Sequence, residues 1–489
     1  MRTRPATGPS PFLKPPAAGR APSQTRMISA GSSAPSSPRV RASQRLDVLM
    51  TWLATLLLVA LLIYELVGIY PFVRLEAGSA GVADGDARRR LILLAMFAAG
   101  LLLCASRPRE ALRLAKACWP ILLILGLMAA SVLWSRFPHL TLRRTIVYWI
   151  YLVIIVGVTV WIRPAPRLLA VCAVTCAIAL ALDLVATAVV PGRSWTPIGL
   201  AALHLHKNMA GSFAFIALAF IGPQFFVARS TMTRLAIIGM FAAGIGFLLL
   251  TQSKNSIGAF AITWLAILPT LVLLRSGRGP AALIMALLAS GLALAFVLSG
   301  ALDWSFSTWI ELGSGDASFT GRTDLWRVAL GYINQAPLVG DGFGAHWSVP
   351  DAAHPLLDKV GWWSGNHQLM LRYNQSHNGY LDLAVQLGLT GIALVLVYLV
   401  VLFAALARVF RLVPGDRRHL APVYGVACLM IGILLLNTLE SSLFFPASSA
   451  GTILLLLSVL VFDWSATLTR ARQSRQPRAS SARAAPSLR

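Results

Sequence analysis

Long apolar runs separated by short polar links make up most of the chain. These runs reach the roughly 20 residues that a helix needs to cross a bilayer. Because backbone N–H and C=O groups in hydrocarbon must be satisfied within their own element, such runs can only be helices. The pattern therefore predicts an all-α, polytopic integral membrane protein. The twelve predicted spans are residues 47–70, 91–106, 118–134, 145–162, 168–190, 208–227, 235–251, 256–274, 280–300, 390–407, 421–438 and 443–463.

One polar stretch, residues 301–389, interrupts this pattern between the ninth and tenth spans. Links between helices usually have about 4–6 residues, so a polar segment of this length indicates a functional loop. Within it, an apolar pattern over residues 325–333 predicts a short helix that stops before Pro337. The chain thus divides into a basic tail (1–46), spans one to nine (47–300), the large loop (301–389), spans ten to twelve (390–463) and a second basic tail (464–489).

Composition supports the membrane class and limits the partners. With 57% hydrophobic residues, 12% charged residues and a mean hydropathy of +0.71, the chain cannot be a soluble multi-domain protein. Much of the net charge of +24 lies in the two tails and in short links. We therefore expect contact with anionic membrane lipids and no binding of nucleic acid. Residues 1–46 are rich in Pro, Ser and basic residues without one acid, which is typical of disorder.

The distribution of Lys and Arg predicts the orientation. With both termini in the cytoplasm, 28 of the 42 basic residues fall on the inside, as the positive-inside rule requires. Only the run Arg88–Arg90 opposes the bias. The large loop then faces outward. No cleavable signal peptide is expected, because the first apolar run is long enough to remain as a span.

Metal and cofactor motifs are absent from the sequence. All five cysteines lie in or at the edges of predicted spans, and Cys172 with Cys176 is better explained as a pair of small buried residues than as metal ligands. Residues 340–344, a glycine-rich run, lack the Lys and Ser or Thr of a phosphate loop and instead indicate a tight turn. We expect no cofactor and no metal.

Unusual polar residues gather at the outward ends of the predicted helices. Each alone has an ordinary explanation, because basic side chains at span ends extend to lipid headgroups and Asn or Ser often caps a helix. Together, cations and helix N-termini at one membrane surface favour an anion site, and lipid-carrier phosphates are the abundant anions at that depth. The groups are Arg143-Arg144, His206-Lys207-Asn208, Ser253-Lys254-Asn255-Ser256 and Glu440-Ser441-Ser442.

Several short motifs occur in an order that resembles a known family. They are Ser131-x-x-Trp134-Ser135, His206-Lys207-Asn208, Thr251-Gln252-Ser253-Lys254, Gly321-Arg322 with Leu325-Trp326, the run 337–343, His377-Asn378-x-Tyr380-Leu381 and Leu387-Gly388-Leu389-x-Gly391. The set is similar to the O-antigen ligase and Wzy-type polysaccharide polymerase family. His206-Lys207-Asn208 and residues 342–347 most resemble its exopolysaccharide polymerase (ExoQ-like) branch.

This resemblance implies a membrane glycosyltransferase with an architecture like the membrane-embedded GT-C class. Its substrate would be an undecaprenyl-diphosphate-linked oligosaccharide, transferred at the periplasmic face with inversion and without a metal. In a polymerase the acceptor is another lipid-linked repeat unit, and in a ligase it is lipid A core. Chain-length regulator and export proteins would be partners of the polymerase.

The residue chemistry fits this reaction without the resemblance. Because diphosphate leaves more easily than an alkoxide, the reaction needs only a base for the acceptor hydroxyl and cations for the departing charge. His377 can supply the base, since a histidine of ordinary pKa is mostly neutral near pH 7. Arg322 can supply the cation as a bidentate fork for phosphate oxygens. The alternatives are a helix-cap partner for His377 and an ion pair with Asp324 or Asp341 for Arg322.

Other residues are weaker candidates for binding diphosphate or sugar. Lys254 stands where many relatives carry Arg, and as a point charge it remains competent for phosphate. Glu440 is an alternative base, and Asp183, deep in a span, is a costly carboxylate without an identified partner. The remaining candidates are Lys207, His206, Arg143, Asn378, Tyr380 and His204.

Two other classes compete with a glycosyltransferase. Secondary transporters often have twelve helices, but they tend to show two related halves and a site at mid-membrane, whereas this chain shows no repeat and its polar residues lie at one face. A transporter of a polysaccharide precursor and a non-catalytic assembly protein are therefore the less favoured functions.

Overall fold

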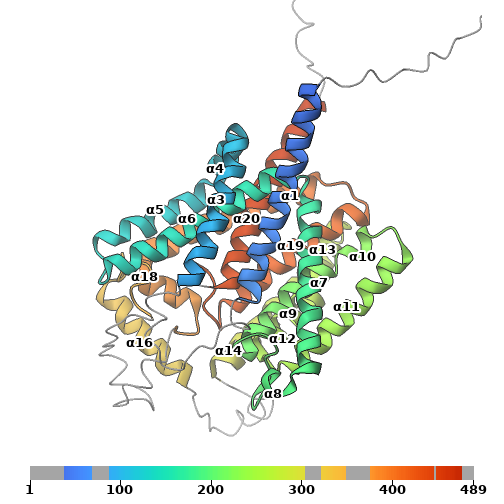
Figure 1. Cartoon of the computed structure of the whole chain (residues 1–489). Coiled ribbons are helices and arrows are strands. Elements are labelled where there is room, and N and C mark those ends of the chain that lie inside the picture. Colours follow the sequence, from blue (N-terminus) through green and yellow to red (C-terminus); the bar gives the residue numbers. More distant parts are fainter. Residues whose placement is uncertain (1–37, 69–86, 303–320, 348–374, 445–447, 476–489) are drawn as a thin grey trace, which may run out of the picture. The chain divides into compact units, whose positions relative to one another are not determined.

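The computed structural model of the chain describes residues 38–68, 87–302, 321–347, 375–444 and 448–475 (Figure 1). Residues 1–47 and residues 48–489 are two separate compact units. The fold and the site described below belong to the second unit. Predictions that concern residues 1–37 or the centre of the large loop lie outside the described residues.

Helices account for almost all of the described chain, which confirms the all-α, multi-pass fold class. The strands β1 (Trp195–Thr196) and β2 (Gly199–Leu200) form one short antiparallel hairpin. The helices are α1 (Pro38–Leu66), α3 (Ala87–Ser106), α4 (Pro108–Ala117), α5 (Trp119–Ala130), η1 (Ser131–Leu133), α6 (Pro138–Trp161), α7 (Ala165–Val189), α8 (Pro191–Ser194), α9 (Lys207–Ile221), α10 (Gln224–Val227), α11 (Thr231–Leu250), α12 (Lys254–Ile262), η2 (Thr263–Ile267), α13 (Leu268–Arg275), α14 (Gly279–Leu302), α16 (Gly321–Gln335), α18 (Gly379–Leu412), α19 (Arg417–Leu436) and α20 (Ser449–Arg475).

The sequence predicts twelve spans, and each of them overlaps a helix of the described residues. In the described residues, ten helices are long and apolar enough to cross a membrane, and a bent pair gives an eleventh. This pair, Pro108–Ala117 with Trp119–Leu133, bends by 80°. Pro120, in the first turn of α5, cannot donate a backbone hydrogen bond to the preceding turn, which accounts for the break. The predicted ninth span corresponds to α14, which has 24 residues.

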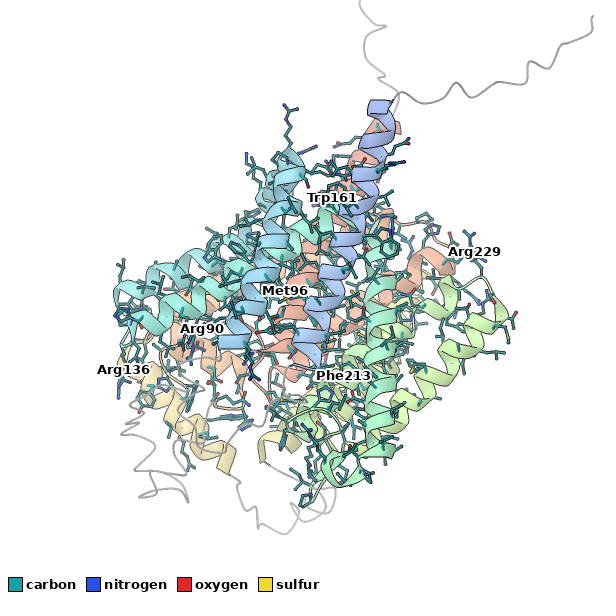
Figure 2. The ribbon with its side chains drawn as sticks, viewed as in Figure 1. Arg90, Met96, Arg136, Trp161, Phe213 and Arg229 are labelled. Carbon is teal, nitrogen blue, oxygen red and sulfur yellow. The ribbon has the colours of Figure 1, made fainter. Side chains whose placement is uncertain are left out.

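Helix α9 is enclosed by other helices. From Ala210 to Ile221 all but one of its residues are buried, including Phe213 (Figure 2), and its neighbours are α7, α11, α12 and α19. A helix that is apolar on all sides is stable only when it is surrounded in this way. Because α9 is held on several sides, its N-terminal residues have a fixed position relative to the starts and ends of the neighbouring helices.

Helix α18 is broken inside its span at Gly388, where φ is +62° and ψ is −166°. The break releases backbone groups that an α-helix normally pairs. The turn 337–342 replaces the lost partners: the N–H groups of Asp341 and Gly342 donate to Val385 O (2.9 Å) and Gln386 O (3.0 Å). In return, Leu389 N donates to Pro337 O (2.8 Å) and Thr390 N to Leu338 O (3.1 Å). The large loop is thus hydrogen-bonded to the interior of a spanning helix.

The predicted tight turn at residues 340–344 is present, and its glycines are required by close contact. Gly340 and Gly342 have φ of +66° and +102°, a region that L side chains rarely adopt. A Cβ at Gly340 would lie 2.5 Å from Val385 O, and one at Gly342 would lie 2.6 Å from Ser135 Cβ. The turn can therefore approach its neighbours only without side chains at these positions.

We predict that Gly388→Ala lowers thermal stability, because it places a Cβ against the Leu338 backbone in a left-handed conformation. Since the change combines backbone strain with a steric overlap, a loss of at least about 2 kcal/mol is expected. The measurement is a melting curve of the purified full-length protein in detergent. Gly239→Ala is the matched control, because a Cβ there meets no atom within 4 Å. Equal melting temperatures for the two variants would contradict the interpretation of the break.

Candidate functional site

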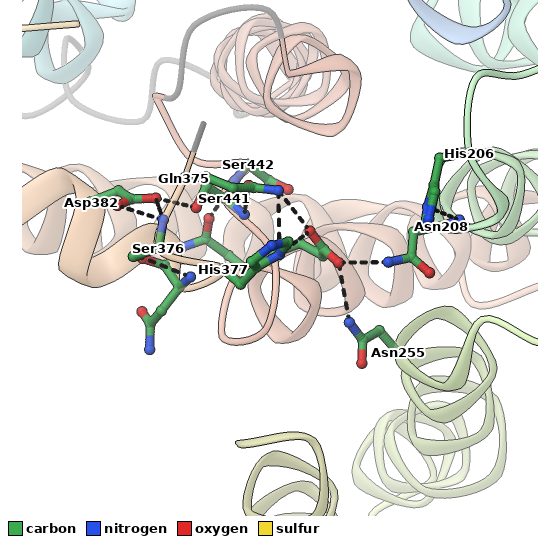
Figure 3. A network of polar contacts seen from close by, with 12 residues as sticks. His206, Asn208, Asn255, Gln375, Ser376, His377, Asp382, Ser441 and Ser442 are labelled. Carbon is green, nitrogen blue, oxygen red and sulfur yellow. Dashed lines mark hydrogen bonds and ion pairs between the residues drawn. The ribbon is translucent and has the colours of Figure 1, made fainter. Parts of the chain in front are cut away.

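Glu440, in the link between α19 and α20, is the centre of a polar network (Figure 3). Its Oε1 accepts hydrogen bonds from Asn208 Nδ2 (2.9 Å) and Asn255 Nδ2 (3.4 Å). Its Oε2 accepts from Gln375 Nε2 (3.1 Å) and lies 3.2 Å from His377 Nδ1. These donors come from the starts of α9 and α12 and from the segment before α18. Four segments that are far apart in sequence therefore meet at one carboxylate.

The position of Glu440 follows from the end of α19. Asn437 ends that helix, and its side-chain Oδ1 accepts hydrogen bonds from Ser442 N (2.9 Å) and Leu443 N (2.7 Å). Its backbone carbonyl also accepts from Gly379 N at 2.8 Å. Asn437 thus folds the link back on the helix and joins it to the start of α18, which leaves Glu440 directed toward the network.

His377 is held by its neighbours in an unusual backbone conformation. Its φ is +55°, a left-handed value that histidine adopts more often than most residues but still uncommonly. Ser376 Oγ donates to Asn378 O (3.0 Å) and accepts from Asn378 N (3.2 Å), so the residues on both sides are fixed. The His377 side chain is 32% exposed, whereas Glu440 is 17% exposed. The imidazole is therefore the more accessible member of the pair.

Asp382, in the first turn of α18, fixes the surrounding segments. Its fully buried carboxylate accepts from Trp347 Nε1 (2.7 Å), from Ser376 N (3.1 Å) and from Ser441 Oγ. One donor lies beside His377 and another beside Glu440. A buried carboxylate is stable only with several such hydrogen bonds. Asp382 was not among the predicted site residues. Its signal in the sequence is that Asp382 and Gln386 stand four residues apart on an otherwise apolar helix.

The helix of Arg322 is attached to the same segment. α16 covers the predicted helix 325–333, and Trp326 Nε1 donates to Ser376 O at 3.2 Å. Arg322 lies in the first turn of α16, one helical turn before Trp326. Its side chain lies outside the described residues, so the proposed grip on phosphate remains a prediction.

The starts of α9 and α12 contribute three of the predicted residues. His206 is the N-cap, and its Nδ1 accepts from Asn208 N at 3.2 Å. Partial burial lowers the pKa of His206; Glu440 opposes this shift, whereas Lys207 and His377 add to it. Lys207 Nζ donates to Ile198 O (2.9 Å) and Gln252 O (3.3 Å), so it joins the hairpin to the link before α12. Lys254 is exposed at the first position of α12, where the N-cap Ser253 makes no side-chain cap.

Three predicted substrate-binding residues occupy other places. Arg143 lies on α6 without a hydrogen bond or ion pair to the described residues, whereas its neighbour Arg144 donates to Gly344 O and to Trp347 O (2.9 Å). Asn378 is the N-cap of α18 and accepts from the N–H groups of Tyr380 (3.1 Å) and Leu381 (3.2 Å). Tyr380 OH donates to a backbone carbonyl of α19, so both Asn378 and Tyr380 have structural contacts.

The intramembrane carboxylate of Asp183 does have a partner. Its Oδ2 lies 3.1 Å from His204 Nε2, and Oδ1 accepts from Leu203 N at 3.1 Å. Both side chains are fully buried. Asp183 and His204 therefore fix the segment before α9 to α7 and take no part in the Glu440 network.

The motif around Ser131 also has a structural explanation. Ser131 Oγ accepts from Phe343 N (3.0 Å), and Trp134 Nε1 donates to Val339 O (3.2 Å). Together with Ser135, which lies against Gly342, these residues hold the turn that fills the break in α18. Their place in the family-like pattern thus reflects positioning of the loop.

The chemistry available at this site is that of a histidine base oriented by a carboxylate. Because Nδ1 of His377 faces Glu440, its Nε2 is the ring nitrogen left for a substrate proton, as in other carboxylate–histidine pairs. Glu440 already accepts four hydrogen bonds and is better suited to orient His377 than to take a proton itself. Among the described residues, no group of three or more His, Cys, Asp or Glu side chains has the spacing of a metal site.

Comparison with known proteins shows which family the chain resembles. Residues 225–396 match the family model described as O-antigen ligase. The predicted family resemblance is confirmed. Over 232 residues the chain is 27% identical to the exopolysaccharide production protein ExoQ of Rhizobium meliloti (strain 1021), covering 46% of this chain and 50% of that protein. The chain thus spans about half the length of the curated relative that it matches. The O-antigen ligase match includes Asn255, Gln375 and His377, whereas Asn208 and Glu440 lie outside it.

We predict that Asp382→Asn destabilises the fold, because the new amide places N–H donors against existing donors. Leaving buried donors unpaired costs about 1–3 kcal/mol for each group. Thermal unfolding of the purified protein measures the loss. Asp416→Asn, at an exposed helix start, is the control and should change stability less. A melting temperature equal to wild type would show that Asp382 does not fix these segments.

Proposed function

We propose that the protein polymerises undecaprenyl-diphosphate-linked oligosaccharide repeat units into exopolysaccharide at the periplasmic face of the bacterial inner membrane. The observation that carries the proposal is the His377–Glu440 pair, which joins the large loop to the starts of α9 and α12. The O-antigen ligase match and the ExoQ relative support glycan assembly in the membrane. The bias of basic residues supports the orientation with both termini in the cytoplasm.

In the proposed reaction, an acceptor hydroxyl attacks the anomeric carbon of the lipid-linked sugar. The new C–O bond forms as the bond to the diphosphate oxygen breaks, with inversion because attack comes from the opposite side. The hydroxyl proton passes to His377 Nε2, and the lipid diphosphate leaves with the electron pair. Because the leaving group is an anion of low basicity, its departure needs stabilisation of charge and no proton donor.

In this proposal, cations at the starts of helices stabilise the negative charge of the departing diphosphate. Lys254 begins α12, so an oxygen anion beside it would also meet the positive end of that helix. Arg322 in the first turn of α16 is the second cation that we assign to the diphosphate. Lys207 is less suited, since its ammonium already bridges two backbone carbonyls.

Transfer to lipid A core by a ligase is the second candidate, because the matching family model is described as O-antigen ligase. Both reactions use the same donor and the same base, and they differ only in the acceptor. A purified-enzyme assay that offers a lipid-linked repeat unit and lipid A core side by side separates them. Elongation of the repeat unit supports the polymerase, and transfer only to lipid A core overturns it. Chain-length regulator and export proteins are the partners implied by the polymerase.

We predict that His377→Gln reduces transfer at least about 100-fold, because general-base catalysis contributes 10²–10⁴-fold. The measurement is the chain length of product formed from the lipid-linked repeat unit. His419→Gln is the matched control, since His419 is exposed beside Asp416 and remote from the Glu440 network. Full-length polymer from the His377 variant, with normal folding, would exclude His377 as the base. Loss of flipping of the lipid precursor in this variant, measured separately, would favour a transporter.

We predict that Glu440→Gln reduces transfer about 10- to 100-fold by loss of the charge that orients His377 and stabilises its protonated form. The double variant with His377→Gln should be no slower than His377→Gln alone, because the two residues act as a unit. A double-mutant cycle in the same assay tests this. Additive losses would show that Glu440 acts independently, for example as the base itself.

A further inference from the structure

A second charged site lies near the C-terminal end of α18, the helix whose N-terminal end adjoins the Glu440 network. A cavity of about 380 Å³ is lined by α4, α18, α20 and the residue Arg163 just after α6. Its charged residues are Glu110, Arg113, Arg163, Arg408, Asp463 and Arg470. Arg144, which contacts the large loop, lies near the start of α6, and Arg163 of the cavity lies just after its end, so about 30 Å separates these two arginines along that helix.

Arg163 forms ion pairs with both carboxylates of the cavity. Its Nε and Nη2 bind Asp463 Oδ2 (3.1 Å) and Oδ1 (2.6 Å) as a bidentate pair. Its Nη1 donates to Glu110 Oε2. This triad joins α4, the end of α6 and α20. The single positive charge of Arg163 neutralises only one of the two negative charges of Asp463 and Glu110.

The other three arginines of the cavity contact neutral groups. Arg113 Nε donates to a carbonyl of its own helix (3.0 Å), and Arg470 Nε does the same (3.3 Å). Arg408 Nη1 donates weakly to Ser465 Oγ at 3.4 Å. In the described part of the chain none of the three forms an ion pair. Four guanidinium groups against two carboxylates leave the cavity with a formal charge of +2.

We propose that this cavity binds the phosphate group of an anionic phospholipid headgroup. Guanidinium forks match phosphate oxygens, and basic pockets between spanning helices are typical binding sites for anionic lipids. A lipid rather than free phosphate is favoured because the wall also contains Leu114, Ala117 and Ala466, and because the cavity lies where spanning helices end. This proposal is independent of the glycosyl transfer at the opposite helix ends.

The test titrates full-length protein in detergent with phosphatidylglycerol and measures the apparent Kd by native mass spectrometry. Wild type should bind phosphatidylglycerol about tenfold or more tightly than zwitterionic phosphatidylethanolamine, and Arg408→Gln with Arg470→Gln should remove that preference. The matched control is Arg278→Gln, an exposed arginine in the link before α14 that does not line the cavity. The double variant Arg408→Lys with Arg470→Lys should keep part of the preference for phosphatidylglycerol, because lysine retains the positive charge but lacks the bidentate guanidinium.

Two outcomes overturn the proposal. One is an equal Kd for the two lipids in wild type, or a glutamine double variant that keeps the wild-type preference. The other is displacement of phosphatidylglycerol by inorganic phosphate alone at low millimolar concentration, which would assign the cavity to a soluble phosphate instead of a headgroup. Melting curves of all variants separate a lost site from a lost fold.

Discussion

A helix that is broken inside must find new partners for the backbone groups that it releases, and the rest of the site depends on how α18 meets this requirement. The turn 337–342 supplies donors and acceptors to both sides of the break at Gly388. It thereby fixes the residues that follow, and Trp347 reaches the buried Asp382. Since Asp382 also binds Ser376 and Ser441, the backbone break determines where His377 and Glu440 lie.

The two carboxylates of this region illustrate how similar groups acquire different functions. Asp382 is fully buried, and its hydrogen bonds join segments of the fold. Glu440 is partly exposed and binds three side-chain amides and one imidazole. The three amides bind the oxygens of Glu440 without bringing a charge of their own. In our proposal the negative charge of Glu440 stabilises a proton on His377, which is what a general base requires of its partner.

Much of the fold could be predicted, because each span carries its own signal in its apolar length. The break in α18 could not, since the Gly388 region is as apolar as any helix and the partner turn is some 50 residues away in sequence. The bend between α4 and α5 was not predicted from the sequence either. Where single residues indicated local structure, as at Pro337 and at the glycines 340–344, the prediction was confirmed.

The site was predictable in its location and less so in its contacts. Polar residues at helix ends indicated His206, Lys254, Glu440 and the segment around His377, but their pairing depends on three-dimensional packing. Asn255 was named only as one of a polar group at a span end, where an Asn usually caps a helix, and Gln375 was not named. Asp183 was suspected without a partner, since His204 follows 21 residues later across a link that gives no sign of turning back.

Two basic residues near the site have hydrogen bonds that stabilise the fold. Arg144 and Lys207 bind backbone carbonyls, and both hold links in place: Arg144 the large loop, Lys207 the segment before α12. A cation with these contacts would have to release a carbonyl in order to bind phosphate, and the released carbonyl would lose a charge-assisted hydrogen bond. Binding of a diphosphate at Arg144 or Lys207 would therefore cost one such hydrogen bond. In our proposal the diphosphate is held by Lys254 and Arg322, at the starts of α12 and α16, while Lys207 keeps its contacts to the hairpin and to the link before α12.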